Sequence, residues 1–183
     1  NGAVKYLSLL KKVVNRAVAN NKIAFNPFAS YKLERQEVSP DFLNEDELRR
    51  IINFNSPLPR LERTRDMFLF ACYTGLSYID VKTLKVEHLE RDNQGRMWIK
   101  KKRVKTGVLA RIPLLPNAKM LIDKYAGGDT LMPIYSDKDI NLYLKDIAIL
   151  CHIDKRITYH TARHTFASTV TLANNISLIV VSK

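Results

Sequence analysis

The chain has 183 residues, of which 46% are hydrophobic, so it can form one domain with a packed core and part of a second, which excludes a disordered chain. Thirty Lys and Arg against eighteen Asp and Glu give a net charge of +12, so the expected partner is a polyanion, with nucleic acid first. The sequence shows no apolar run of about 18 residues, no signal pattern and no lipidation motif, so we expect a cytoplasmic protein without a membrane partner. Cys72 and Cys151 lie among apolar residues and are predicted to be reduced core thiols, and we expect no metal site.

The N-terminal part is predicted to be a helix followed by a linker. Apolar residues recur at helical spacing over residues 4–17, while the basic residues Lys12 and Arg16 lie off the apolar stripe. Residues 28–40 are polar and lack a clear period, which indicates a linker with a domain boundary near Val38.

The next segment is predicted to be helical. Asn44 and Glu47 have the spacing of a capping box, which begins a helix that runs to about residue 54. A second helix is expected over residues 61–73 and stops at Gly75, because glycine readily adopts the left-handed conformation after a helix. A short helix over residues 77–84 follows.

A basic segment between two turns predicts a small antiparallel sheet. Strand formers at 97–99 and 108–114 follow the turn residues at 93–95 and 106–107. Eight basic residues and one acidic residue lie between positions 91 and 111, so we expect the hairpin to contact DNA, although such a run also occurs on merely solvated faces. The predicted DNA contacts, with those of the first helix, are Lys12, Arg16, Lys100, Lys101, Lys102 and Thr106.

Further helices are expected over residues 117–125, 137–150 and 161–173. The predicted fold class is therefore mainly α with a small antiparallel β-sheet (α+β). Ser177 is expected to cap one more helix.

The sequence HTARHTFA at residues 160–167 carries the most informative chemistry. His160 and Arg163 are three apart and share a helix face, which offers an imidazole for proton transfer and a guanidinium fork for a phosphate. In isolation the pattern also fits an arginine paired with a carboxylate and a capping or core histidine. Two other motifs accompany it, TGLSYID at residues 74–80 and RVKTG at residues 103–107.

With these three motifs in this order, the chain resembles the tyrosine recombinases, the phage integrase family. The resemblance implies the catalytic-domain fold of that family and DNA strand exchange, in which a tyrosine attacks a backbone phosphate and forms a 3′-phosphotyrosine. It implies double-stranded DNA as partner, no metal or other cofactor, and a prokaryotic, nucleoid-associated protein. Residues 1–37 resemble the end of the core-binding domain, and residues 38–183 resemble the catalytic domain.

The resemblance also implies roles for single residues. Arg163 would stabilise the charge on the phosphate, Lys105 would protonate the leaving oxygen, and His160 would position the attacking oxygen. Asp80 resembles the acid that braces the first catalytic motif, although it also fits an ordinary aspartate at a helix N-terminus. We interpret His164 as a buried, hydrogen-bonded structural residue.

The chain departs from the family pattern at Ser77, where most members carry the first catalytic arginine and some integrases of mobile elements carry serine. Residues two apart on a strand share a face, so an extended hairpin would place Arg103 beside Lys105 as a substitute. The alternative is that Arg103 is one more backbone contact, in which case Arg96 and Arg111 are the next candidates.

No tyrosine of the sequence follows Arg163, so we expect a C-terminally truncated fragment that lacks the nucleophile and the second His or Trp. Such a fragment is expected to be inactive alone and monomeric, whereas the full-length enzyme would form a tetramer on DNA. Two other functions stay open at this point: a non-catalytic DNA-binding regulator with the same fold, and a relative of type IB topoisomerases.

Overall fold

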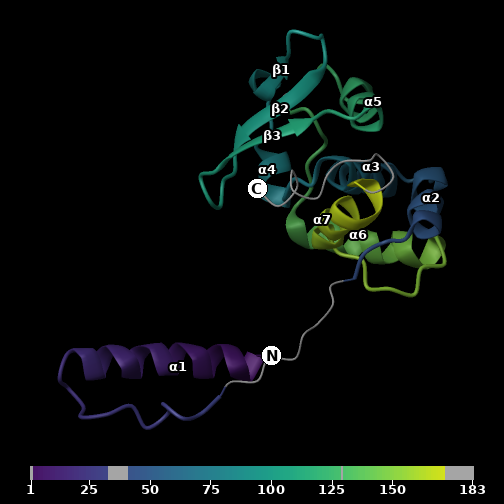
Figure 1. Cartoon of the computed structure of the whole chain (residues 1–183). Coiled ribbons are helices and arrows are strands. Elements are labelled where there is room, and N and C mark those ends of the chain that lie inside the picture. The colour runs from purple at the N-terminus through teal and green to yellow at the C-terminus, as the bar shows by residue number, and fades with distance from the viewer. Residues whose placement is uncertain (1, 33–40, 129, 172–183) are drawn as a thin grey trace. The chain divides into compact units, whose positions relative to one another are not determined.

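The computed structural model describes residues 2–32, 41–128 and 130–171 (Figure 1). Contacts within the chain divide it into two units, residues 1–39 and 40–183. The first unit contains α1 (Gly2–Ala19), in which no side chain is buried. The predicted boundary near Val38 lies outside the described residues, and so does the helix expected after Ser177.

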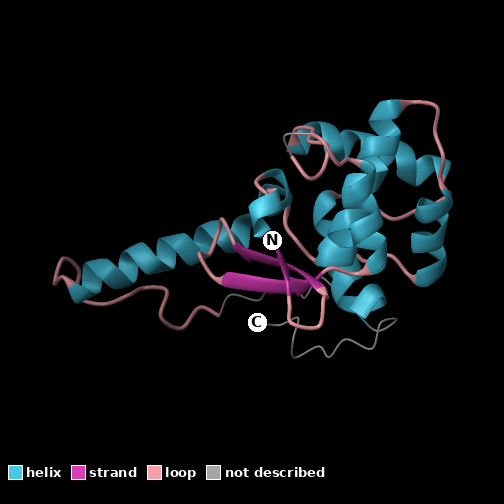
Figure 2. Ribbon diagram, turned by 90° about the horizontal axis from the view of Figure 1, so that it is seen from above, coloured by secondary structure: helices cyan, strands magenta, loops and turns pink. Residues whose placement is uncertain are grey.

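The second unit combines helices with one small sheet. The strands are antiparallel in the order β1-β2-β3, and this sheet, drawn in magenta in Figure 2, accompanies a mainly helical unit, which confirms the predicted fold class. The helices are α2 (Glu45–Asn53), α3 (Pro59–Thr74), α4 (Tyr78–Lys82), the 3-10 helix η1 (Val86–His88), α5 (Pro116–Lys124), α6 (Asp137–Leu150), α7 (Tyr159–Thr165) and the π-helical turn η2 (Phe166–Val170), and the strands are β1 (Leu89–Arg91), β2 (Met97–Lys102) and β3 (Leu109–Pro113).

The helix α3 forms the centre of this unit. It packs against α5, α6, α7 and η2, and nearly all of its side chains after the first turn are buried. Figure 1 shows α2, α3, α6 and α7 together, with the sheet and α5 beside them. Apolar burial of this extent is the main source of stability in a domain, so α3 is the element on which the others are positioned.

Helix ends follow the local signals in the sequence. The Asn44 side chain accepts a hydrogen bond from the Glu47 amide, and the Glu47 carboxylate accepts one from the Asn44 amide, each at 2.8 Å. The helix α3 ends at Gly75, which has a φ of 65°. A side chain at this position would also meet the Phe166 ring, because a Cβ would lie 2.5 Å from Cδ1 of that residue. Gly75 thus lets the end of α3 approach η2 closely.

The two faces of the sheet differ in chemistry. Ile99 and Ile112 are paired across β2 and β3 and are buried toward the core. Lys101 lies two residues from Ile99 on the same covered face, is 6% exposed, and donates from Nζ to the Thr83 carbonyl oxygen at 2.9 Å. The prediction that Lys101 contacts DNA is therefore wrong, because strand alternation turns this one lysine of the run inward.

Several elements differ from the sequence prediction. The sequence does not predict the strand β1, because its three residues, Leu-Glu-Arg, carry no clear preference for a strand. The last described helix begins at Tyr159, and residues 166–170 adopt π-helical geometry rather than continuing the α-helix. Cys72 and Cys151 are unpaired and buried, as expected.

Candidate functional site

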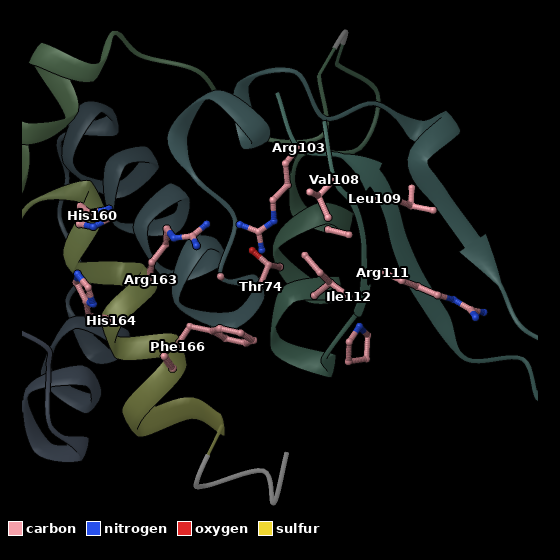
Figure 3. Close-up of a pocket in the computed structure, with 14 residues that line it drawn as sticks. Thr74, Arg103, Val108, Leu109, Arg111, Ile112, His160, Arg163, His164 and Phe166 are labelled. Carbon is pink, nitrogen blue, oxygen red and sulfur yellow. The ribbon is translucent and has the colours of Figure 1, made fainter. Parts of the chain in front are cut away.

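A cavity of about 430 Å³ brings the three sequence motifs together. It lies where the end of α3, the β2–β3 hairpin and the helix α7 meet (Figure 3). Its lining includes Thr74 and Gly75 from the first motif, Arg103 from the second, and His160, Arg163, His164, Phe166 and Ala167 from the third, with part of β3.

Two guanidinium groups point toward each other at this cavity, those of Arg103 and Arg163 (Figure 3). Within the described ranges, neither side chain forms an ion pair with a carboxylate. Burial lowers the pKa of Arg163, the charge of Arg103 lowers it further, and Asp80 acts in the opposite direction. Two like charges in a partly buried site favour an anion that offers several oxygens, since such a ligand neutralises both.

Asp80 ties the hairpin to the start of α4. It is 2% exposed, accepts a hydrogen bond from the Ser77 hydroxyl at 2.6 Å, and accepts another from the Val104 amide at 2.9 Å. Asp80 therefore lies in the first turn of α4, as the alternative of an aspartate without a catalytic role has it, and its bond to Val104 also fixes the residue that follows Arg103.

The predicted strand geometry for Arg103 and Lys105 is wrong. The strand β2 ends at Lys102, and residues 104–106 form a turn closed by two backbone bonds of 2.8 Å between Arg103 and residues 107 and 108. Arg103 is the last residue before this turn, and it lines the cavity. Lys105 lies in the exposed turn and does not line the cavity.

The two histidines of the third motif stand side by side. The rings of His160 and His164 lie 4.7 Å apart in an edge-to-face arrangement, and both line the cavity. Burial, followed by the charges of His160 and Arg163, lowers the pKa of His164. The expectation of a buried, hydrogen-bonded His164 is wrong, because this side chain is only half-buried and its ring bonds to no other described residue.

The other predicted DNA contacts lie on exposed surfaces. Lys102 and Thr106 are exposed at the hairpin, and Lys100 is exposed but paired with Glu90 at 3.0 Å. Lys12 and Arg16 are exposed on α1, in the other unit.

Thr74 and Phe166 line the cavity, although the sequence analysis did not assign them to the site. The Thr74 hydroxyl donates to the Phe70 carbonyl oxygen at 2.8 Å and caps the last turn of α3 at the cavity wall. Phe166 lines the cavity where η2 begins, against Gly75. The sequence signal that could have identified them is their place in the first and third motifs, where Thr74 precedes Gly75 and Phe166 follows Arg163 by three residues. Neither side chain is a typical acid, base or charged ligand, so neither was singled out.

In the described part of the chain, no cluster of three or more His, Cys, Asp or Glu side chains could hold a metal ion. No helix within the same ranges has both the length and the apolar character needed to cross a bilayer.

Comparisons with known proteins agree with this geometry. The model of the phage integrase family matches residues 41–182. The fold is similar to that of a lambda integrase dimer bound to a COC′ core site, with a TM-score of 0.69 and 21% identity over 90% of this chain and 50% of that chain. It is also similar to the Tn1549 transposon integrase in complex with circular intermediate DNA, with a TM-score of 0.71 and 15% identity over 94% of this chain and 66% of that chain.

A third similar structure is the XerH site-specific recombinase bound to a palindromic difH substrate, with a TM-score of 0.58 and 18% identity over 78% of this chain and 45% of that chain. The chain thus spans about half the length of the lambda integrase and XerH chains. The comparison with curated protein sequences gave no match. The match over residues 41–182 confirms the resemblance drawn from the three motifs: the chain belongs to the phage integrase family.

Proposed function

We propose that this chain is the catalytic part of a site-specific DNA recombinase or integrase, which cuts and rejoins double-stranded DNA through a 3′-phosphotyrosine. The observation that carries the proposal is the pair of guanidinium groups, Arg103 and Arg163, that share one cavity without a carboxylate partner among the described residues. The similar solved structures include integrases and a recombinase in complex with DNA, which supports DNA as the substrate.

In this proposal the two arginines bind the nonbridging oxygens of the phosphate that reacts. Negative charge gathers on these oxygens in the transition state, and fixed donors aimed at such charge are commonly worth about 10² to 10³ in rate. Arg103 takes the place of the arginine that most family members carry where this chain has Ser77. Asp80 and Ser77 act as positioning residues, because they hold the turn that presents Arg103.

His160 and Lys105 take the proton-transfer roles. His160 lies on the cavity wall one helical turn from Arg163, so it is placed to position or buffer the attacking oxygen. Lys105 protonates the leaving 5′-oxygen as the general acid. It lies two residues after Arg103 in an exposed turn, where a bound DNA strand would contact it.

The reaction in this form needs no metal or other cofactor. Residues 1–37 form the end of the core-binding domain in this proposal, and the full-length enzyme acts as a tetramer on DNA while this chain alone is a monomer. In this proposal the nucleophile is a tyrosine that follows Arg163, as the family resemblance implies, and each tyrosine of this sequence precedes that residue. The 183-residue chain therefore binds DNA but does not cleave it.

Covalent capture on DNA tests the proposal. A longer form of the protein that includes a tyrosine after Arg163 is incubated with labelled target DNA and then denatured. We expect a protein–DNA adduct whose DNA is attached at its 3′ end, and no adduct with the 183-residue chain. An adduct formed by the 183-residue chain would show that one of its own tyrosines is the nucleophile, and DNA that is never captured by the longer form would contradict the assigned activity.

A further inference from the structure

A second group of cations lies on the outer face of the sheet, next to the cavity. Trp98 on β2 contacts two guanidinium groups: the Arg111 Cζ lies 4.8 Å from the ring centroid, and the Arg96 Cζ lies 5.7 Å from it. Both distances fall within the range of about 6 Å in which an aromatic face attracts a cation. We call Trp98, Arg96, Arg111 and Asp92 the Trp98 cluster.

Asp92 fixes the tryptophan in place. Its carboxylate accepts a hydrogen bond from the Trp98 Nε1 at 3.0 Å, one from the Arg96 Nε at 2.8 Å, and two from the backbone amides of Gln94 and Arg96 at 2.9 Å each. These bonds, that of Trp98 first, hold the pKa of Asp92 well below its usual value. These bonds fix the orientation of the indole ring. Asp92, the only carboxylate of the cluster, already accepts four hydrogen bonds.

The charge of this surface is not balanced. Among the described residues, Arg111 and the neighbouring Arg91 form no ion pair, and the nearby Glu90 pairs with Lys100 at 3.0 Å. A hollow of about 390 Å³ lies here, lined by Arg91, Asp92, Asn93, Gln94, Arg96, Trp98 and Arg111. An arginine stacked on an aromatic ring keeps its N–H groups for a phosphate, because stacking uses the face of the guanidinium and hydrogen bonding uses its edge.

Arg111 borders the cavity, but its guanidinium does not join the pair formed by Arg103 and Arg163. Its side chain points away from Arg103 and Arg163 (Figure 3). Arg103 bonds through its amide to Val108, and Arg111 lies three residues further along the same hairpin, so the backbone positions of Val108 and Arg111 are about 10 Å apart at the rise of a β-strand.

We propose that the Trp98 cluster is a second phosphate-binding site, which holds the backbone of the bound DNA outside the cavity that takes the reacting phosphate. The inference rests on the proposed function, because it takes DNA as the ligand of the neighbouring cavity. DNA is favoured over an acidic peptide or lipid surface because Arg111 borders both hollows, so that one extended polyanion can occupy them together.

The chain offers a direct probe, since Trp98 is its single tryptophan. Binding of a short DNA duplex is measured by the anisotropy of a dye on the DNA, and the environment of Trp98 by its own fluorescence and by acrylamide quenching. We expect that the tryptophan emission changes along the same binding curve and that bound DNA protects it from acrylamide. Anisotropy that rises while Trp98 stays unaffected would overturn the second site and leave the proposed function standing, whereas a failure to bind DNA at all would remove both.

Variants assign the effect to the arginine. Arg111→Ala is expected to weaken DNA binding about tenfold and to reduce the slope of log affinity against log salt by about one, because one charge-assisted phosphate contact is lost. Arg111→Lys keeps the positive charge but loses the planar guanidinium group over the Trp98 ring. Its affinity for DNA should therefore lie between that of wild type and that of Arg111→Ala. The matched control is Arg49→Ala, since Arg49 is exposed on α2 and pairs with Asp46 at 3.6 Å. Equal behaviour of Arg111→Ala and Arg49→Ala would contradict the proposal.

Discussion

Two groups of cations in this protein show opposite arrangements. At Asp66, between α3 and α5, one fully buried carboxylate accepts hydrogen bonds from Arg65 at 2.8 Å and from Lys124 at 2.7 Å. At the cavity, Arg103 and Arg163 lie together without such a carboxylate partner in the described residues.

The pKa values of the two groups are shifted in opposite directions. Burial lowers the pKa of Lys124, but hydrogen bonds to Asp66 and Glu62 more than offset this and the pKa is raised. Burial and the charge of Arg103 both lower the pKa of Arg163. The first arrangement stabilises the folded chain, whereas the second destabilises it until an anion binds, which is the pattern expected of a functional site.

The largest expected effect concerns salt. If the unpaired cations serve to bind DNA, about six to ten phosphate contacts should make the affinity for duplex DNA fall by about 10³ to 10⁵ between 50 and 200 mM salt. Filter binding or a gel-shift assay over this range measures it. Affinity that is insensitive to salt, or absent at low salt, would indicate that the net charge of +12 has another purpose.

The next effect concerns cleavage by a longer form of the protein that carries the nucleophile. Arg163→Ala should lower the rate of strand cleavage by about 10² or more while most DNA binding is kept, because one contact among many contributes little to affinity. Arg163→Lys should fail as well, since lysine lacks the planar fork. Near-normal cleavage by either variant would remove Arg163 from the site.

The same assay separates the roles of the hairpin residues. Arg103→Ala and Lys105→Ala should depress cleavage far more than Lys102→Ala does when each variant occupies the DNA equally. Lys102 is a suitable control because it is exposed and adjacent, whereas Lys101 is buried and its removal would disturb the sheet. Small and equal losses in Arg103→Ala and Lys102→Ala would leave Arg103 as a backbone contact.

Substitution of Asp66, which pairs with Arg65 and Lys124, should lower the stability of the fold rather than the activity. Asp66→Asn leaves Arg65 and Lys124 without their shared carboxylate, and removal of one member of a buried charged network costs about 3 to 5 kcal/mol. Urea unfolding of the variant should show a loss of this size. An unchanged midpoint would mean that water, rather than Asp66, solvates these cations.

Much of the fold could be read from local sequence, because the deciding interactions are local. The capping pair of Asn44 and Glu47 and the left-handed Gly75 each act within one turn of a helix. The inward direction of Lys101 could not be foreseen, since the charge of a residue argues against burial and only the register of the sheet decides it. The π-helical turn after Thr165 likewise packs against α3, a tertiary contact that the local sequence does not reveal.

The candidate site likewise contains residues that the local sequence predicts and residues whose positions depend on tertiary structure. The three motifs identified Arg163, His160 and the hairpin, because their spacing is a property of the chain. Arg103 reaches the cavity through the turn and its tether to Asp80, and not through the strand alternation on which the prediction relied. Contacts between residues about sixty positions apart, such as Arg103 and Arg163, are fixed by tertiary packing alone.

Thermal unfolding of Arg103→Gln tests the contrast between the two groups most directly. If Arg103 and Arg163 repel each other in the free protein and share a phosphate in the complex, the free variant should melt at or slightly above wild type, by about 2 to 4 °C for 1 kcal/mol of relief, and should gain less from saturating DNA. Lys124→Gln serves as the control and should melt lower with its gain from DNA unchanged. A free Arg103→Gln protein that is destabilised as strongly as Lys124→Gln, with an undiminished gain from DNA, would contradict the account.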